Sequence, residues 1–253
     1  TIPQNALFGN VVGGTFIEGI YPTIGGSITD AEAGATIDVT AGTFTENVTV
    51  NKSVTIKGAH AGVNNCSAGR SSESKMQNCA FIIAANYVTI DGFAFTGDNA
   101  YVGSSSGMWS NVSILNNRIY STSAANPIVA HMSAGASDWT IQYNNIDQID
   151  PSGAAAISVR NVNDVDILNN CIGAYNGGDA RGIALDGVLT AQVKENTINL
   201  GDANPATAAT AAYGVTVRMT DRLSQDISIT SNTISNVHIG VATLGEGDIG
   251  GSR

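Results

Sequence analysis

A short alternation of apolar and polar positions recurs seven times along the chain. Each copy holds hydrophobic residues two positions apart and ends in Gly or Asn. Alternation with a period of two predicts a β-strand, and Gly and Asn tolerate the left-handed backbone that a tight bend requires. The copies begin at Val54, Val88, Val112, Trp139, Val165, Ala191 and Ile227, and their turn residues are Gly58, Gly92, Asn117, Asn145, Asn170, Asn196 and Asn232.

A second apolar position follows each bend, so that a strand, a short bend and a second strand recur as one unit. When such units stack, each turn residue lies above the previous one, and buried amides can satisfy one another along the stack. The post-bend residues are Ile119, Ile146, Ile172, Ile198 and Ile234. The predicted ladder of turn side chains consists of Asn117, Asn145, Asn170, Asn196 and Asn232.

A third strand lies between the copies, at Pro127–His131, Ala156–Arg160, Gly182–Asp186, Gly214–Arg218 and Gly240–Leu244. The turn residues are separated by 34, 25, 28, 25, 26 and 36 residues. A base period near 25 residues with a few longer copies is typical of a solenoid. Three strands per period predict an all-β fold, a single right-handed parallel β-helix of about eight or nine coils.

The repeat divides the chain into three segments. Residues 1–34 lack it and are predicted to form a cap or an irregular first coil, residues 35–245 form the β-helix, and residues 246–253 form a tail or linker. No stretch carries a convincing amphipathic helix. Because an uncovered end of the stack invites pairing with another chain, and the C-terminal segment offers no recognisable cap, head-to-tail association with a second copy is one predicted partnership.

The chain resembles the parallel β-helix repeat proteins, a superfamily that includes pectate lyases, polygalacturonases, pectin methylesterases, alginate-modifying enzymes, phage tailspikes and bacterial surface proteins. The resemblance covers residues 35–245, and Gly42–Glu46 is similar to the Gly-x-aromatic-x-Glu step in the opening coils of pectin methylesterase-like proteins. The catalytic motifs of pectin methylesterases, polygalacturonases and pectate lyases do not occur in the sequence. The resemblance therefore implies a fold and leaves the activity open.

The outward positions of the third strands form the most interesting group of candidate site residues. His131, Arg160, Asp186 and Arg218 would form a row with steps of about 4.8 Å. Arg can hold a sugar carboxylate, Asp can bind calcium or act as a base, and His can act as an acid or base. The same alternation of charge also stabilises neighbouring strands without any ligand. The resemblance implies that a polysaccharide lies on such a face in related enzymes.

Net charge and hydropathy exclude several classes of partner. The formal net charge is −10, and nucleic acid is therefore not an expected partner, since phosphate binding needs a basic face. No apolar run approaches the roughly 20 residues of a membrane span. The regular pattern and 43% hydrophobic residues argue against disorder. The chain starts at Thr1 without Met, which favours an exported protein whose signal peptide was removed, although an arbitrary boundary gives the same start.

Cysteines and acidic pairs supply the remaining candidates. Cys66 and Cys79 flank one insertion, and a disulfide between them, which would imply an oxidising compartment, is weighed against three unpaired thiols. Cys171 is expected to be a buried thiol at an Ile-like position. The spacing of the cysteines does not fit a zinc site. Asp164 with Asp166, or Asp147 with Asp150, could bind calcium, but acidic surface turns explain these pairs as well, and no cofactor is otherwise expected.

Two functions of different classes fit these observations. The leading hypothesis is a non-enzymatic, extracellular or cell-surface module of a surface, filament or adhesion protein, which binds a second copy of itself or a surface polysaccharide. The alternative is a lyase, epimerase or hydrolase that acts on an acidic polysaccharide through the row from His131 to Arg218. Aromatic residues, on which sugars stack, make up only 6% of the chain, which favours the first hypothesis.

Overall fold

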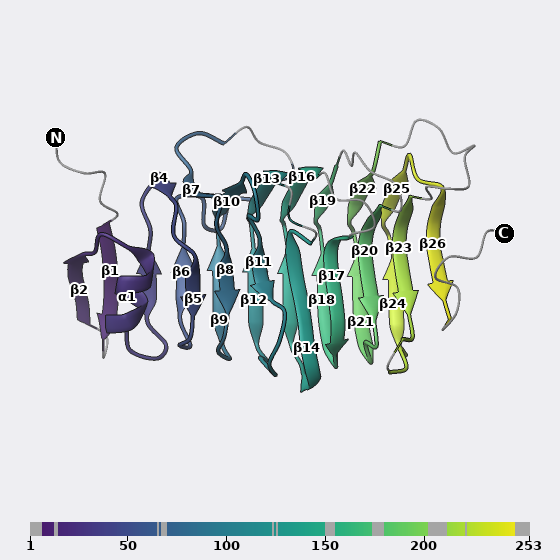
Figure 1. Ribbon diagram of the computed structural model, residues 1–253, viewed down its shortest axis with the longest axis horizontal. Helices are drawn as coiled ribbons and strands as arrows, with labels where there is room; N and C mark the ends of the chain where they lie inside the picture. The colour runs from purple at the N-terminus through teal and green to yellow at the C-terminus, as the bar shows by residue number, and fades with distance from the viewer. Residues whose placement is uncertain are drawn as a thin grey trace.

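A computed structural model describes residues 7–12, 15–64, 66, 70–122, 124, 126–149, 155–173, 180–201, 212–220 and 222–245. Three all-parallel sheets of eight strands each form a three-sided, right-handed parallel β-helix of eight coils, as Figure 1 shows. The predicted fold class is therefore confirmed. No helix among the described residues is long and apolar enough to cross a membrane.

Every coil contributes one strand to each sheet, and the three sheets are named here in chain order. The first sheet contains β3 (Thr36–Asp38), β6 (Thr55–Lys57), β9 (Val88–Asp91), β12 (Val112–Leu115), β15 (Trp139–Gln142), β18 (Asp164–Leu168), β21 (Thr190–Lys194) and β24 (Ile227–Thr230). The second sheet contains β4 (Gly42–Phe44), β7 (Ser74–Gln77), β10 (Phe93–Thr96), β13 (Arg118–Thr122), β16 (Asn145–Ile149), β19 (Cys171–Ile172), β22 (Thr197–Asn199) and β25 (Thr233–Ser235). The third sheet contains β5 (Val48–Val50), β8 (Phe81–Ile83), β11 (Val102–Ser104), β14 (Ile128–Ala136), β17 (Ala155–Val162), β20 (Arg181–Asp186), β23 (Tyr213–Arg218) and β26 (Ile239–Leu244).

The hydrophobic core is a set of vertical stacks inside the coil. In the first sheet, Ile90, Ile114, Ile141, Ile167 and Val193 lie in register on successive strands and are fully buried. Burial of one such side chain contributes about 1.5–3 kcal/mol. Each coil therefore depends on its neighbours, because its inward face is buried only between two other coils.

A ladder of asparagine side chains closes the bend between the first and second sheets. Asn170 Oδ1 accepts hydrogen bonds from the backbone N and Nδ2 of Asn144 at 2.9 and 3.0 Å, and Asn170 Nδ2 donates to Ile141 O at 2.8 Å. The same pattern is repeated from coil to coil, with separations of 27, 26, 26 and 36 residues. Its members are Asn117, Asn144, Asn170, Asn196 and Asn232.

The sequence-based assignment of Asn145 to this ladder is wrong by one residue. The residue with left-handed backbone precedes the ladder asparagine: Asn116 has φ of 51° and Asn169 of 54°, and in the intervening coil Tyr143 takes this conformation with φ of 57°. The bend therefore starts one position earlier than the Asn–Asn pair suggests. Asn145 instead begins β16, in register with Arg118 and Cys171.

The N-terminal end of the core is covered by non-repetitive structure. The antiparallel hairpin of β1 (Leu7–Val12) and β2 (Thr15–Ile20) is followed by α1 (Ile24–Asp30), whose Ile24 and Ile28 are buried. Glu46 accepts hydrogen bonds from the first backbone amides of α1, at 2.7 Å from Ile24 N and 3.2 Å from Gly25 N. The seven residues of α1 make barely two turns, and so short a segment shows no convincing amphipathic pattern in the sequence. The three-segment division stays a prediction, and residues 246–253 lie outside the described residues.

The disulfide differs from the predicted pair. Cys66 is bonded to Cys171, with a Cα–Cα distance of 5.5 Å, whereas Cys79 is a free thiol in the core. The insertion that carries Cys66 reaches along the coil instead of closing on itself, and Cys171 is half-buried on the second sheet. The Cys66–Cys79 pairing and the buried-thiol assignment of Cys171 are therefore both wrong. The bond joins residues 105 apart, and a loop of that size corresponds to about 4.7 kcal/mol of chain entropy.

Adjacent substitutions in one bend test the register of the ladder. Asn144→Ala removes a fully buried amide that bonds to Asn117, Ile114 and Asn170, and it should lower the free energy of unfolding by about 3 kcal/mol or more. Asn145→Ala, at a half-buried outer position, should cost less than about 1 kcal/mol. Urea denaturation followed by circular dichroism measures both values, and equal losses would contradict the register.

Candidate functional site

The structure brings the four candidate residues of the third strands into one row on the third sheet. Backbone register pairs His131 with Arg160, Arg160 with Asp186, and Asp186 with Arg218 on β14, β17, β20 and β23. Neighbouring strands are about 4.8 Å apart. All four side chains are half-buried, so the row is a feature of the outer face.

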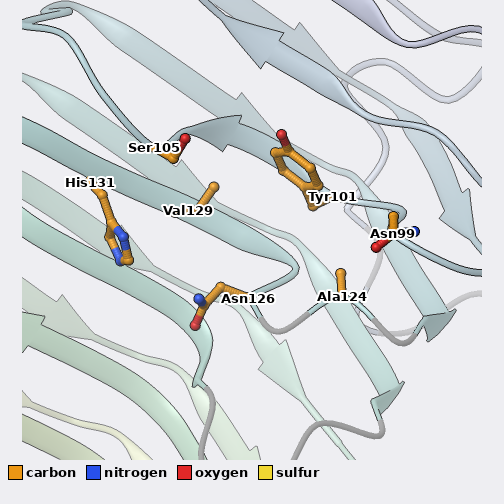
Figure 2. A pocket seen from close by; sticks show the side chains of 7 residues that line it. All are labelled: Asn99, Tyr101, Ser105, Ala124, Asn126, Val129 and His131. Atoms are coloured by element: carbon orange, nitrogen blue, oxygen red, sulfur yellow. The ribbon is translucent and has the colours of Figure 1, made fainter.

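A pocket of about 250 Å³ lies at the His131 end of this row. Figure 2 shows Tyr101 and His131 on opposite sides of Val129. The lining combines an aromatic ring, amides, a hydroxyl and an imidazole over a small apolar floor. Its residues are Asn99, Tyr101, Ser105, Ala124, Asn126, Val129 and His131.

Gly103 lies between Tyr101 and Ser105, two residues that line the pocket. It lies on β11 beside Val129 of β14, and its φ of +141° is one that residues with a side chain rarely adopt. A Cβ built at Gly103 would lie 1.8 Å from Val129 O. The strand can therefore hold only glycine at this position.

The surroundings of His131 favour a neutral imidazole. Its Nε2 lies 2.6 Å from Ser158 Oγ on the neighbouring strand. Burial lowers the pKa of His131 below its ordinary value, and the Arg160 cation lowers it further, while the Asp186 carboxylate acts in the opposite direction. A neutral imidazole at neutral pH can both donate and accept a hydrogen bond.

The other end of the row is tied to the scaffold. Asp186 accepts hydrogen bonds from Thr220 N at 3.0 Å and from Thr220 Oγ1 at 2.9 Å, in the loop that follows β23. Thr216 on β23 is completely buried although it continues the outward positions of Ser158 and Ala184. Thr220 therefore holds the Asp186 carboxylate in place by two hydrogen bonds.

The candidate calcium pairs find limited support in the geometry. Asp164 and Asp166 lie on β18, where burial and the neighbouring Asp164 carboxylate raise the pKa of Asp166. Two carboxylates supply few of the six to eight oxygen ligands that Ca²⁺ takes. Within the described part of the chain, no group of three or more His, Cys, Asp or Glu side chains is arranged for a metal ion. Asp150 lies outside the described residues, so calcium binding by Asp147 and Asp150 stays a prediction.

Sequence reasoning missed most of the pocket. Asn99, Tyr101, Ala124 and Asn126 lie in connections between strands, and such segments do not follow the repeat. Trp139, the first residue of one repeat copy, is buried in the core, and its indole Nε1 donates to Trp109 O at 2.8 Å. A usable signal was Gly103, because an isolated Gly inside a strand often marks a close backbone approach.

Comparisons with known proteins find similarity in the fold only. No family model matches the chain, and no curated protein matches it. An alginate lyase from Paenibacillus is similar with a TM-score of 0.40 and 12% identity, over 86% of this chain and 96% of that one. A pectate lyase has a TM-score of 0.31 and 9% identity over 84% and 73% of the two chains. The A-module of a mannuronan C-5 epimerase from Azotobacter vinelandii has a TM-score of 0.21 and 12% identity over 78% and 64%.

The titration of His131 tests the electrostatics of the pocket. We expect its pKa below the ordinary 6.5, with Arg160→Gln raising it and Asp186→Asn lowering it further. Between the lowered pKa of His131 in the folded protein and the ordinary value of 6.5 in the unfolded chain, the unfolded chain binds more protons than the folded protein. The stability that neutral His131 contributes is therefore present above 6.5 and is lost as the pH falls toward the folded pKa. NMR of the imidazole resonance, assigned with His131→Gln, measures the midpoint, and a midpoint at or above 6.5 would contradict this environment.

Proposed function

We propose that the chain is an extracellular β-helix module that binds an acidic polysaccharide on the outer face of its third sheet. The observation that carries the proposal is the pocket of Figure 2, which His131 lines. His131 is in register with Arg160 on the neighbouring strand. Tyr101 offers an aromatic surface for a sugar ring. Asn99, Asn126 and Ser105 offer donors and acceptors for hydroxyl groups. The disulfide supports an oxidising, extracellular compartment.

The repeat of the scaffold favours a polymer over a small ligand. Successive strands of the third sheet present their outward residues at steps of about 4.8 Å. A chain that runs along the axis would meet Tyr101 before β11, His131 on β14 and Arg160 on β17 in turn. An extended ligand of repeating units matches such a surface.

Arg160 supports an acidic sugar in particular. A guanidinium can bind a carboxylate through two parallel hydrogen bonds. The protein as a whole carries a net charge of −10, which repels an anionic polymer at long range. Recognition would therefore depend on cations close to the bound carboxylates, and Arg160, the register partner of His131, is one such cation.

Cleavage of the polymer by β-elimination is the second candidate, and the neutral His131 in the same pocket as Tyr101 favours it. A neutral imidazole can remove the proton on the carbon next to a uronate carboxylate, and Arg160 can stabilise the resulting charge. The electron pair then forms the carbon–carbon double bond, the glycosidic C–O bond breaks, and the leaving oxygen takes up a proton. This step needs no cofactor.

Affinity electrophoresis in gels that contain pectate or alginate tests the binding proposal, with dextran as the neutral polymer. Arg160→Ala should weaken retardation by the acidic polymers about tenfold, equivalent to about 1.4 kcal/mol. Tyr101→Ala should weaken it as well. Lys194→Ala, which removes a half-exposed cation on the first sheet, is the matched control and should leave retardation unchanged.

The same mixtures separate binding from cleavage. Ultraviolet absorbance of an unsaturated uronate that appears with wild type and disappears with His131→Gln would establish the lyase reaction. Retardation without any absorbance would support the binding module. Retardation equal for all three polymers, or unaffected by Arg160→Ala, would refute recognition of acidic sugars at this face.

Self-association remains a separate proposal. On the last described strand Val241 is 47% exposed although its register partner Val215 is fully buried, and no described residue covers this end of the core. The opposite end is covered by α1, so stacking would use the C-terminal coil of at least one copy. Multi-angle light scattering of wild type and Val241→Asp should show a higher mass for wild type only, and one monomeric mass at every concentration would contradict association.

A further inference from the structure

A second pocket, of about 420 Å³, lies on the outer face of the second sheet, on a different side of the coil from the pocket of Figure 2. Its walls come from the first two coils and from β13. The lining residues are Ala41, Gly42, Thr43, Ser72, Glu73, Lys75 and Tyr120. Gly42, Thr43, Lys75 and Tyr120 lie on strands of the repeat, whereas the row of His131 and Arg160 does not contribute to this pocket.

One wall of this pocket is the end of the insertion between β6 and β7, residues 58–73, which we call the strap. The strap is fixed at two described points. Cys66 is bonded to Cys171 of β19. Arg70 is buried, and its guanidinium donates from Nη1 to Asn116 O at 2.9 Å and from Nη2 to Gly92 O at 3.0 Å. Ser72 and Glu73 follow directly and are thereby held against the sheet.

The accessible charge of the pocket is positive. Glu73 Oε1 lies 3.3 Å from Arg70 Nε, and both carboxylate oxygens of Glu73 are shielded from solvent. Glu73 lines the pocket, but the adjacent Arg70 guanidinium offsets the charge of this buried carboxylate. Lys75 on β7 is half-buried, and the ion pairs found among the described residues, Arg70–Glu73 and Lys194–Glu195, do not include it. A ligand in this pocket therefore meets the Lys75 cation.

The other walls suit a sugar ring. Tyr120 contributes an aromatic ring, and the Arg118 guanidinium stacks on it at 4.3 Å from the centroid, which restricts its orientation. Thr43 and Ser72 supply hydroxyl groups. An aromatic wall, the Lys75 cation and several hydroxyls together match a ring with hydroxyl groups and one carboxylate.

We infer that this pocket binds a single uronic acid unit, and that the Cys66–Cys171 disulfide holds the site in shape through the strap. The site is separate from the polysaccharide face proposed for the third sheet. The proposed ligand of this site is a monosaccharide, so binding here can be tested independently of polymer binding on the third sheet.

Titration of ¹⁵N-labelled protein with sodium glucuronate tests the inference. Amide resonances of Thr43, Ser72 and Tyr120 should shift, and Lys75→Met should weaken this binding at least tenfold. Arg160→Met, which removes a cation from the third sheet, should leave these shifts unchanged. Glucose should bind at least tenfold more weakly than glucuronate because it lacks the carboxylate.

Several outcomes would refute specific glucuronate binding in the pocket on the second sheet. Equal shifts with sodium acetate would reduce it to a general anion effect at Lys75. Shifts that vanish with Arg160→Met and persist with Lys75→Met would assign glucuronate to the third sheet only. In that case the site on the second sheet fails while the polysaccharide face gains support. Conversely, intact glucuronate binding at Thr43 and Ser72 without any retention of the polymers would support the site on the second sheet and refute the polysaccharide face.

The role of the strap has its own measurement. The Cys66→Ser/Cys171→Ser variant should bind glucuronate at least fivefold more weakly than wild type, with an unchanged circular dichroism spectrum. Should this variant fail to fold, wild-type protein reduced under native conditions provides the same comparison. Cys79→Ala, which leaves the disulfide intact, is the control. Unchanged affinity without the disulfide would refute the strap's part in the site.

Discussion

Hydrogen bonding from one coil to the next is the constraint on which the whole molecule depends. No coil can pair its own strands with one another, so backbone N–H and C=O groups must find partners on the coils above and below. The ladder extends this rule into the bend, where Asn170 receives two hydrogen bonds from Asn144 and donates to Ile141. Each coil thereby fixes the phase of the next, and outward residues far apart in sequence, such as His131 and Asp186, are brought into one row.

The same constraint divides the residues of a strand by their role. A slip of one residue would exchange the inner and outer faces of a strand, so the inward positions admit only residues that fill the core. The outward positions are not bound in this way. On the third sheet they hold Gly103, Val129 and Ser158 at one level of the register, a series that runs from no side chain to a polar one. The pocket exists because the scaffold tolerates such variation on its outer face.

The repeat can be predicted from the sequence because its signals are local. The errors in the sequence-based predictions occur where the interaction that decides the structure is not local. The phase of one bend depends on Tyr143, a residue that sequence rules do not favour for the left-handed conformation it adopts. The disulfide depends on the path of the strap over several coils, which no spacing of Cys66 and Cys79 reveals. The row from His131 to Arg218 follows from strand register alone and was predicted. The pocket beside it needed the positions of Tyr101 and Asn126 in irregular connections.

The two pockets share a physical logic despite lying on different sheets. Each pocket is lined both by strands of the repeat and by a non-repetitive segment. This segment is the connection that carries Asn126 in the first pocket and the strap in the second. Each also places a cation, Arg160 or Lys75, within a chain whose net charge is −10. Long-range attraction cannot bring an anion to such a protein, and screening confines a single cation to a range of about 8–10 Å. Selectivity for acidic sugars must therefore come from geometry at short range, which a rigid coil is well suited to maintain.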